Sequence, residues 1–181
     1  MLTQYKACLV GCGRMGATID DEVRHRPDSS IWLPFSHAAA CVACDQTELV
    51  AVSDVLPEKA EAIRQRYDAS RCYTDYREMI EVEEPDIVCV ATRPASRAEI
   101  TIFAAQHGVK GIYCEKPLCC SMEEADAMVE AVKANNVKDP YGSLWLESYG
   151  TISKEYDITV IGVSNVGNIT GGVWQGRKCI G

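Results

Sequence analysis

Residues 5–16 read YKACLVGCGRMG. Tyr5–Val10 is a short run of β type, and Gly11–Gly16 follows it with the pattern G-x-G-x-x-G. Ala17–Ile19 could then open a helix. In such a unit the first glycine allows a tight turn, the second lets the backbone approach a pyrophosphate, and the third lets helix and strand pack closely. The stretch predicts a dinucleotide-binding turn, against the alternative of a glycine turn with no ligand.

The same order of strand and helix repeats along the chain. Strands of the buried type are expected at Leu49–Ser53, Ile87–Ala91 and Gly111–Cys114, and a helical pattern follows each of them. A polar loop over Val23–Pro34 enlarges the first crossover. Strands that alternate with helices in this way predict an α/β fold, with a doubly wound parallel sheet covered by helices on both faces.

The composition changes sharply at residue 139. Residues 1–138 contain nineteen alanines, whereas residues 139–181 contain none and hold eight of the thirteen glycines. We therefore expect a dinucleotide-binding domain over 1–138 and a short, irregular C-terminal extension over 139–181. Tyr156–Val163 could form one strand within that extension.

Length, composition and charge limit the class of protein. The chain has 181 residues, 47% of them hydrophobic and 24% charged, as in one globular domain. Its net charge is −8 and it has no long basic run, so nucleic acid is not an expected partner. No apolar stretch reaches the ~20 residues of a membrane helix, and we expect a cytoplasmic protein with no membrane partner. Its ten cysteines are then expected to be reduced thiols rather than a disulfide framework.

Asp54 directly follows the second expected strand. An acidic side chain at this place can accept hydrogen bonds from the adenosine ribose hydroxyls and repel a 2′-phosphate, which favours NAD over NADP. Asp54 lies 38 residues after Gly16 (54 − 16), a longer separation than usual that the enlarged crossover explains. Two alternatives stay open: Asp54 could cap the helix that starts near Pro57, and Ser53 leaves room for dual cofactor use.

Two further turns are expected at the carboxyl edge of the sheet, where doubly wound folds bind ligands. Thr92-Arg93-Pro94 follows the strand over Ile87–Ala91, and Glu115-Lys116-Pro117 follows the strand over Gly111–Cys114. A lysine held at this edge by a neighbouring proline could shuttle a proton. The alternatives are a plain turn at 92–94 and an ordinary surface role for Lys116.

Together these motifs resemble the Gfo/Idh/MocA family of oxidoreductases. The resemblance covers residues 5 to about 138, and the order and spacing of five motifs make it specific. The motifs are Gly11–Gly16, Leu49–Asp54, Thr74–Tyr76, Pro85–Thr92 and Glu115–Leu118.

The resemblance implies a Rossmann domain, a nicotinamide cofactor and a set of site residues. The function it implies is NAD(P)-dependent hydride transfer between nicotinamide and a hydroxyl or carbonyl group of a sugar, polyol or related small molecule. Lys116 would be the catalytic residue, which contacts the substrate hydroxyl and assists proton transfer. The implied cofactor-binding residues are Gly11, Gly13, Arg14, Met15 and Gly16 at the phosphates, Asp54 at the adenosine ribose, Thr92, Arg93 and Pro94 along the dinucleotide, and Glu115 near the nicotinamide ribose.

Some features depart from the family pattern. Many members carry histidine where this chain has Arg97, and the family's second, α+β domain has no counterpart in residues 139–181, so we expect a truncated member. This leaves open a dinucleotide-binding module without turnover, such as a sensor or partner subunit. A sheet that has lost its second domain could also self-associate into a homo-oligomer.

The cysteines offer two weaker alternatives. Cys41 and Cys44 have C-x-x-C spacing, but no second pair accompanies them, so no metal site is expected. Cys119 and Cys120 precede a helix, where a thiol can become reactive. A thiol-based redox module is therefore a third candidate function.

Overall fold

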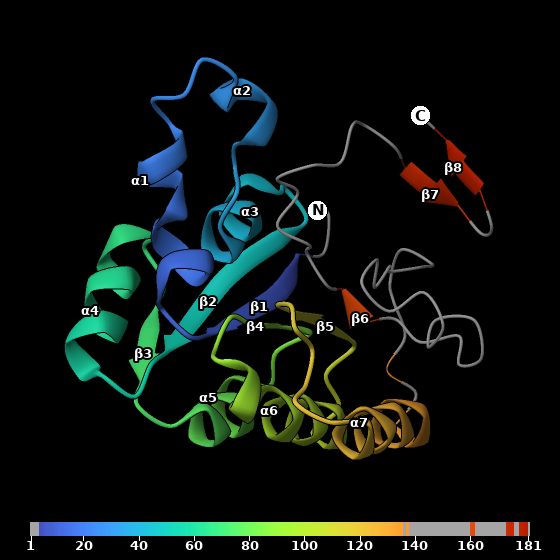
Figure 1. The fold of residues 1–181 in the computed structure, drawn as a ribbon. Coiled ribbons are helices and arrows are strands. Elements are labelled where there is room, and N and C mark those ends of the chain that lie inside the picture. Colours follow the sequence, from blue (N-terminus) through green and yellow to red (C-terminus); the bar gives the residue numbers. More distant parts are fainter. Residues whose placement is uncertain (1–3, 136, 138–159, 162–172, 176–177, 181) are drawn as a thin grey trace.

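The computed structural model describes residues 4–135, 137, 160–161, 173–175 and 178–180 (Figure 1). Its main sheet has six parallel strands in the order β3-β2-β1-β4-β5-β6, which confirms the doubly wound α/β prediction. The strands are β1 (Tyr5–Val10), β2 (Thr47–Ser53), β3 (Arg71–Tyr73), β4 (Ile87–Val90), β5 (Gly111–Cys114) and β6 (Val160–Ile161).

The helices cover both faces of this sheet. Helices α5, α6 and α7 lie side by side along one face, at the bottom of Figure 1, and α3 and α4 pack on the other. The helical segments are η1 (Arg14–Thr18, a π-helix), α1 (Ile19–Val23), α2 (Ser29–Trp32), α3 (His37–Ala43), α4 (Pro57–Arg66), α5 (Tyr76–Glu83), α6 (Pro94–Gln106) and α7 (Met122–Ala134).

Two apolar clusters, one on each face, hold the sheet between the helix layers. Along β1, Cys8 and Val10 join the cluster under α5, α6 and α7, while Ala7 and Leu9 join the cluster under α3 and α4. Successive side chains of a strand point to opposite faces, so a strand covered on both sides needs an unbroken apolar run. This is why the central strands lack the polar alternation of a half-exposed sheet.

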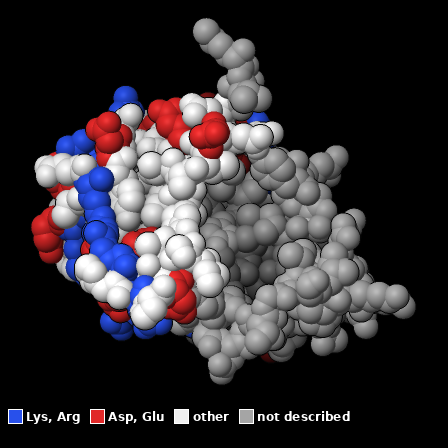
Figure 2. All heavy atoms as spheres, turned by 90° about the horizontal axis from the view of Figure 1, so that it is seen from above, with Lys and Arg blue, Asp and Glu red and all other residues white. Residues whose placement is uncertain are grey.

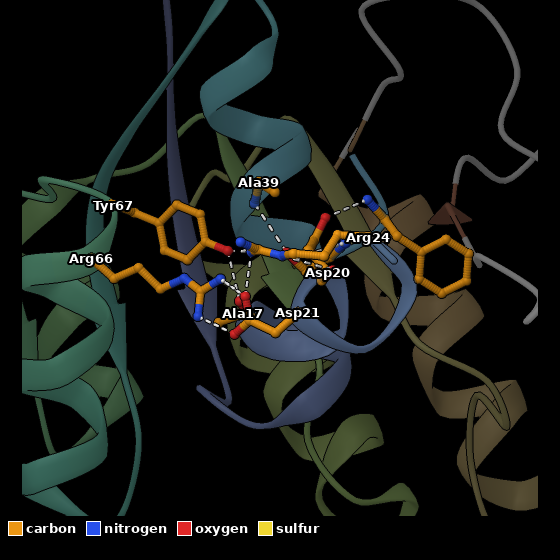
Figure 3. Close-up of polar contacts among 9 residues, drawn as sticks. Ala17, Asp20, Asp21, Arg24, Ala39, Arg66 and Tyr67 are labelled. Atoms are coloured by element: carbon orange, nitrogen blue, oxygen red, sulfur yellow. Dashed lines mark hydrogen bonds and ion pairs between the residues drawn. The ribbon is translucent and has the colours of Figure 1, made fainter. Parts of the chain in front are cut away.

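The enlarged first crossover is fixed where it returns to the sheet (Figure 3). The carboxylate of Asp20 accepts the N–H groups of Phe35 (2.9 Å) and Ser36 (3.0 Å). The hydroxyl of Ser36 in turn accepts the N–H of Ala39 and caps α3. These bonds determine where α3 begins.

A second set of contacts in Figure 3 joins α4 to the helices that follow β1. Arg66 donates to both carboxylate oxygens of Asp21, at 2.6 and 2.8 Å, and the Tyr67 hydroxyl donates to the carbonyl of Ala17 at 2.6 Å. The hydrogen bonds from Arg66 lower the pKa of Asp21. The segments that follow β1 and β2 are thereby held together.

The surface carries both signs of charge, and Figure 2 shows acidic side chains beside basic ones on one face. Ion pairs at the surface, such as Arg24 with Asp21 and Arg64 with Glu61, contribute little to stability, so the fold depends mainly on the two buried clusters. In the part of the chain that the structure describes, no helix has the length and apolar character needed to cross a membrane.

The 139–181 extension lies mostly outside the described residues. Within the predicted strand over Tyr156–Val163, Val160–Ile161 forms β6 and pairs with β5. Two further short strands, β7 (Val173–Gln175) and β8 (Lys178–Ile180), form an antiparallel pair. The expected boundary at residue 138 remains a prediction.

Candidate dinucleotide site

A cavity of about 630 Å³ opens at the carboxyl ends of β1, β2 and β4. This is the edge at which doubly wound folds bind their ligands. The turns after three strands, with the first residues of the helices that follow them, form most of its wall. They contribute Gly11, Gly13, Arg14 and Met15 after β1; Asp54, Val55, Leu56 and Lys59 after β2; and Thr92, Arg93, Ser96 and Arg97 after β4.

The three glycines of the first turn are required for different reasons. Gly11 has a φ of +99°, and a Cβ placed on it would lie 2.9 Å from the carbonyl carbon of Ala91. A Cβ on Gly16 would lie 1.9 Å from the carbonyl oxygen of Gly11. Gly13 has an ordinary φ of −84°, and a Cβ placed on it would meet no atom within 4 Å. The fold thus requires glycine at 11 and 16. Gly13 lines the cavity, and a side chain on it would point into open space.

Asp54 ties the end of β2 to the glycine turn. One carboxylate oxygen accepts the N–H of Cys12 at 2.9 Å, and the other accepts the N–H of Leu56 at 3.0 Å. The N-cap residue of α4 is Leu56, not Asp54, so the alternative that Asp54 caps this helix is wrong. An ionised carboxylate has about four acceptor positions, and two therefore remain for a ligand.

Arg14 lines the cavity, but its charge is directed toward α1. Its Nε lies 2.7 Å from Glu22 Oε1 and its Nη2 lies 2.8 Å from Glu22 Oε2, a bidentate pair at an exposed position. These hydrogen bonds lower the pKa of Glu22. Met15, the next residue, also lines the cavity. Both predicted residues are therefore placed at the cavity, with the Arg14 guanidinium already paired.

The turn after β4 is placed as expected, in part. Thr92 and Arg93 line the cavity, whereas Pro94 is the first residue of α6 and does not. Ser96 donates from its hydroxyl to that of Thr92 at 3.0 Å, which fixes the turn internally. Two of the three predicted residues thus belong to the cavity wall.

The turn after β5 lies beside the cavity rather than in its wall, since neither Glu115 nor Lys116 is among the lining residues. Glu115 is only 2% exposed, and its carboxylate lies 3.2 Å from His37 Nε2. The adjacent Pro117 offers its carbonyl to the guanidinium of Arg97, which does line the cavity. Arg97 is therefore the link between this turn and the cavity.

Several residues of the site were not expected from the sequence. Val55 (83% exposed) and Leu56 (41% exposed) present apolar side chains to the cavity directly after Asp54, and Lys59 follows one turn later. An apolar pair between an aspartate that follows a strand and a proline that starts a helix is a signal that could have been used. His37 gives no such local signal, and Arg97 was noted only as a departure from the family pattern.

Neither Cys119, Cys12 nor the acidic groups provide evidence for a second chemical site in the described part of the chain. The nine cysteines between residues 8 and 120 are free, as expected for reduced thiols. Burial raises the pKa of Cys119 and raises that of Cys12 to about 12, so neither thiol is activated. Among the described residues, no group of three His, Cys, Asp or Glu side chains could hold a metal ion.

The parallel sheet, the glycine turn and the acidic residue at the end of β2 define a dinucleotide-binding Rossmann domain. The chain belongs to the Gfo/Idh/MocA family: the family model described as "Oxidoreductase family, NAD-binding Rossmann fold" matches residues 5–139. The resemblance seen in the sequence is confirmed, and the family's cofactor is a nicotinamide dinucleotide.

Named relatives agree with this assignment. The chain is 30% identical to the D-apiose dehydrogenase of Paraburkholderia graminis over 134 residues, 74% of this chain and 31% of that protein. It is also 30% identical to the myo-inositol 2-dehydrogenase of Thermotoga maritima over 101 residues, 56% of this chain and 30% of that protein. The chain thus spans about a third of the length of these relatives.

A solved structure gives the same result for the fold. The probable dehydrogenase from Thermotoga maritima superposes with a TM-score of 0.58 at 25% identity, over 73% of this chain and 34% of that one. The match again covers about a third of the longer chain.

Proposed function

We propose that this chain supplies the cofactor-binding domain of an NAD(P)-dependent dehydrogenase, which transfers hydride between nicotinamide and a hydroxyl or carbonyl group of a sugar, polyol or related small molecule. The observation that carries the proposal is Gly13, a glycine that the fold does not require and that faces the open cavity. The names of the relatives, D-apiose dehydrogenase and myo-inositol 2-dehydrogenase, support a hydroxylated substrate.

The cavity has the chemistry that a dinucleotide needs. The missing Cβ at Gly13 gives a pyrophosphate access to the backbone, and Lys59, Arg93 and Arg97 add positive charge to the cavity wall. Asp54 has acceptor positions left for ribose hydroxyls, and Val55 with Leu56 offers an apolar surface for a purine ring. When bound, the nicotinamide supplies the hydride donor or acceptor. This chain's residues hold it in place.

Within this proposal NAD is the preferred cofactor. The carboxylate of Asp54 would repel a 2′-phosphate at the position where it accepts the ribose hydroxyls. Lys59 lines the same cavity and opposes this effect, so the preference rests on the hydrogen bonds of Asp54 as well as on its charge.

Asp54→Ala should weaken NADH binding by about 1.5–3 kcal/mol, roughly 10- to 150-fold, because hydrogen bonds to a charged group are lost. NADPH binding should weaken less, since a repulsion is removed at the same time. Isothermal calorimetry with both cofactors measures the difference. Asp86→Ala is the matched control: Asp86 also accepts a backbone N–H, that of Lys6 at 2.8 Å, and lies outside the cavity wall directly before β4, so its loss should leave NADH affinity unchanged. Equal losses for the two cofactors would contradict the proposed role of Asp54.

Lys116 is the proposed proton-transfer residue. It is partly exposed in the turn after β5, and its ammonium group makes no hydrogen bond or ion pair with any described residue. It is therefore available to a substrate hydroxyl bound near the turn after β5.

Lys116→Ala should leave NADH affinity unchanged and lower any polyol-dependent turnover by about 10²- to 10⁴-fold, the usual contribution of a positioned acid or base. The assay follows NADH absorbance with a panel of polyols and sugars. Lys110→Ala is the control, because Lys110 is paired with Asp86 at 2.5 Å and does not line the cavity. Equal turnover in Lys116→Ala would end the assignment, and cofactor binding without turnover in the unaltered chain would favour a binding module.

A further inference from the structure

The turn that carries Lys116, residues 115–117, is held by hydrogen bonds from both helix layers of the sheet. On one side Glu115 continues from β5 with its N–H bonded to the carbonyl of Val90 at 2.9 Å. The two oxygens of its carboxylate make separate hydrogen bonds. One is bonded to His37 Nε2 at 3.2 Å, and the other accepts the N–H of Lys116 at 3.1 Å. His37 is thereby connected to the backbone of Lys116 through a single side chain.

His37 is itself held rigidly. It is the first residue of α3, is 2% exposed, and lies against the ring of Tyr113 with ring centroids 4.2 Å apart. Its Nδ1 is buried without a hydrogen-bond partner in the described structure. A proton on Nε2 suits this arrangement, since Nε2 then donates to the carboxylate of Glu115 and only a lone pair lacks a partner.

On the other side the turn is held by Arg97 of α6. Arg97 is 6% exposed, and its Nε (3.0 Å) and Nη2 (2.5 Å) donate to the carbonyl of Thr92. Its Nη1 donates to the carbonyl of Pro117. Among the described residues Arg97 forms no ion pair with a carboxylate. Burying a cation on carbonyl groups alone is unfavourable for stability, so this arrangement points to a role in fixing the two turns.

These hydrogen bonds hold Glu115 and Pro117, the two residues that flank Lys116. The ammonium group of Lys116 itself has no partner among the described residues. We propose that His37, acting through Glu115, and Arg97, acting through the Pro117 carbonyl, are positioning residues that fix Lys116 beside the cavity. The proposal rests on the proposed function, since it gives these residues a purpose only if Lys116 meets the substrate.

The test reads the environment of the Lys116 side chain directly and needs no turnover. The full chain is reductively methylated with ¹³C-formaldehyde, and the dimethyl-lysine resonances are recorded by NMR, with Lys116→Arg identifying the resonance of Lys116. The clamp variants are His37→Leu and Arg97→Lys. The latter keeps the charge but not the fork that reaches two carbonyls, and the resonance of its added lysine is identified in the double variant Arg97→Lys/Lys116→Arg. His37→Gln is the rescue variant, because its amide can still donate to Glu115.

In the unaltered chain the Lys116 resonance should be resolved from those of freely exposed lysines. It should shift into their envelope in His37→Leu and Arg97→Lys and stay in place in His37→Gln, while the Lys110 resonance is unchanged in all three. If the clamp variants lower the melting temperature but leave the Lys116 resonance in place, the contacts are only structural and the proposal is overturned. It is overturned as well if His37→Gln behaves as His37→Leu does. NADH titration of the unaltered chain tests the proposed function separately, so the two failures can be told apart.

Discussion

Replacing Gly13 with valine is expected to abolish NADH binding while leaving the protein folded. The backbone at Gly13 has a φ of −84° and a ψ of −162°, an extended conformation that a β-branched residue adopts readily. The new side chain meets no protein atom at its Cβ, so it projects into the cavity where the pyrophosphate must approach. We expect affinity to fall by more than about 100-fold, which corresponds to about 2.7 kcal/mol.

Two measurements on the same variant check this result. Calorimetric titration gives the loss of affinity, and thermal unfolding followed by circular dichroism shows whether the fold survives. A Gly13→Val protein that binds NADH as the unaltered chain does would remove the glycine turn from the site. One that unfolds would show that Gly13 serves the fold after all.

Replacing Gly16 with alanine should have the opposite effect, a large loss of stability. The added Cβ would lie 1.9 Å from the carbonyl oxygen of Gly11 and 3.3 Å from the Cβ of Ala91. A Cβ has no rotamer by which to escape, so the backbone of the η1 segment or of the turn must move. Overpacking of this kind costs about 3 kcal/mol at its upper end, which should lower the melting temperature by about 6–12 °C.

Urea unfolding of Gly16→Ala and Gly13→Ala side by side gives the clearest comparison. The two variants add the same methyl group three residues apart, and only Gly16→Ala should lower the unfolding midpoint. An unchanged midpoint in Gly16→Ala would mean that the turn is looser than the structure shows.

Much of the fold could be predicted because its signals are local. Leu49–Ser53 and Ile87–Ala91 are apolar runs of strand length, and they form β2 and β4 to within two residues. The polar loop over Val23–Pro34 was predicted as an interruption, but it contains α2, a single turn of four residues. A helix that short has too few residues to show a 3.6-residue period, so its sequence could not reveal it.

The candidate site could be predicted where it lies at the ends of strands. Asp54 and Thr92 reach the cavity because parallel strands end at one edge, which the order of elements already implies. The contacts of His37 with Glu115 and of Arg97 with Pro117 join residues 78 and 20 positions apart. No periodicity or motif encodes such pairings, since they depend on how α3 and α6 pack on the sheet.

Every role proposed for this chain depends on the cavity at the carboxyl ends of β1, β2 and β4 binding a nicotinamide dinucleotide. Isothermal titration calorimetry of the 181-residue chain with NADH, and separately with NADPH, measures that binding. We predict one NADH per chain with micromolar affinity, weaker NADPH binding, and loss of both in Gly13→Val. A folded chain that binds neither cofactor would contradict the assignment of this cavity as a dinucleotide site.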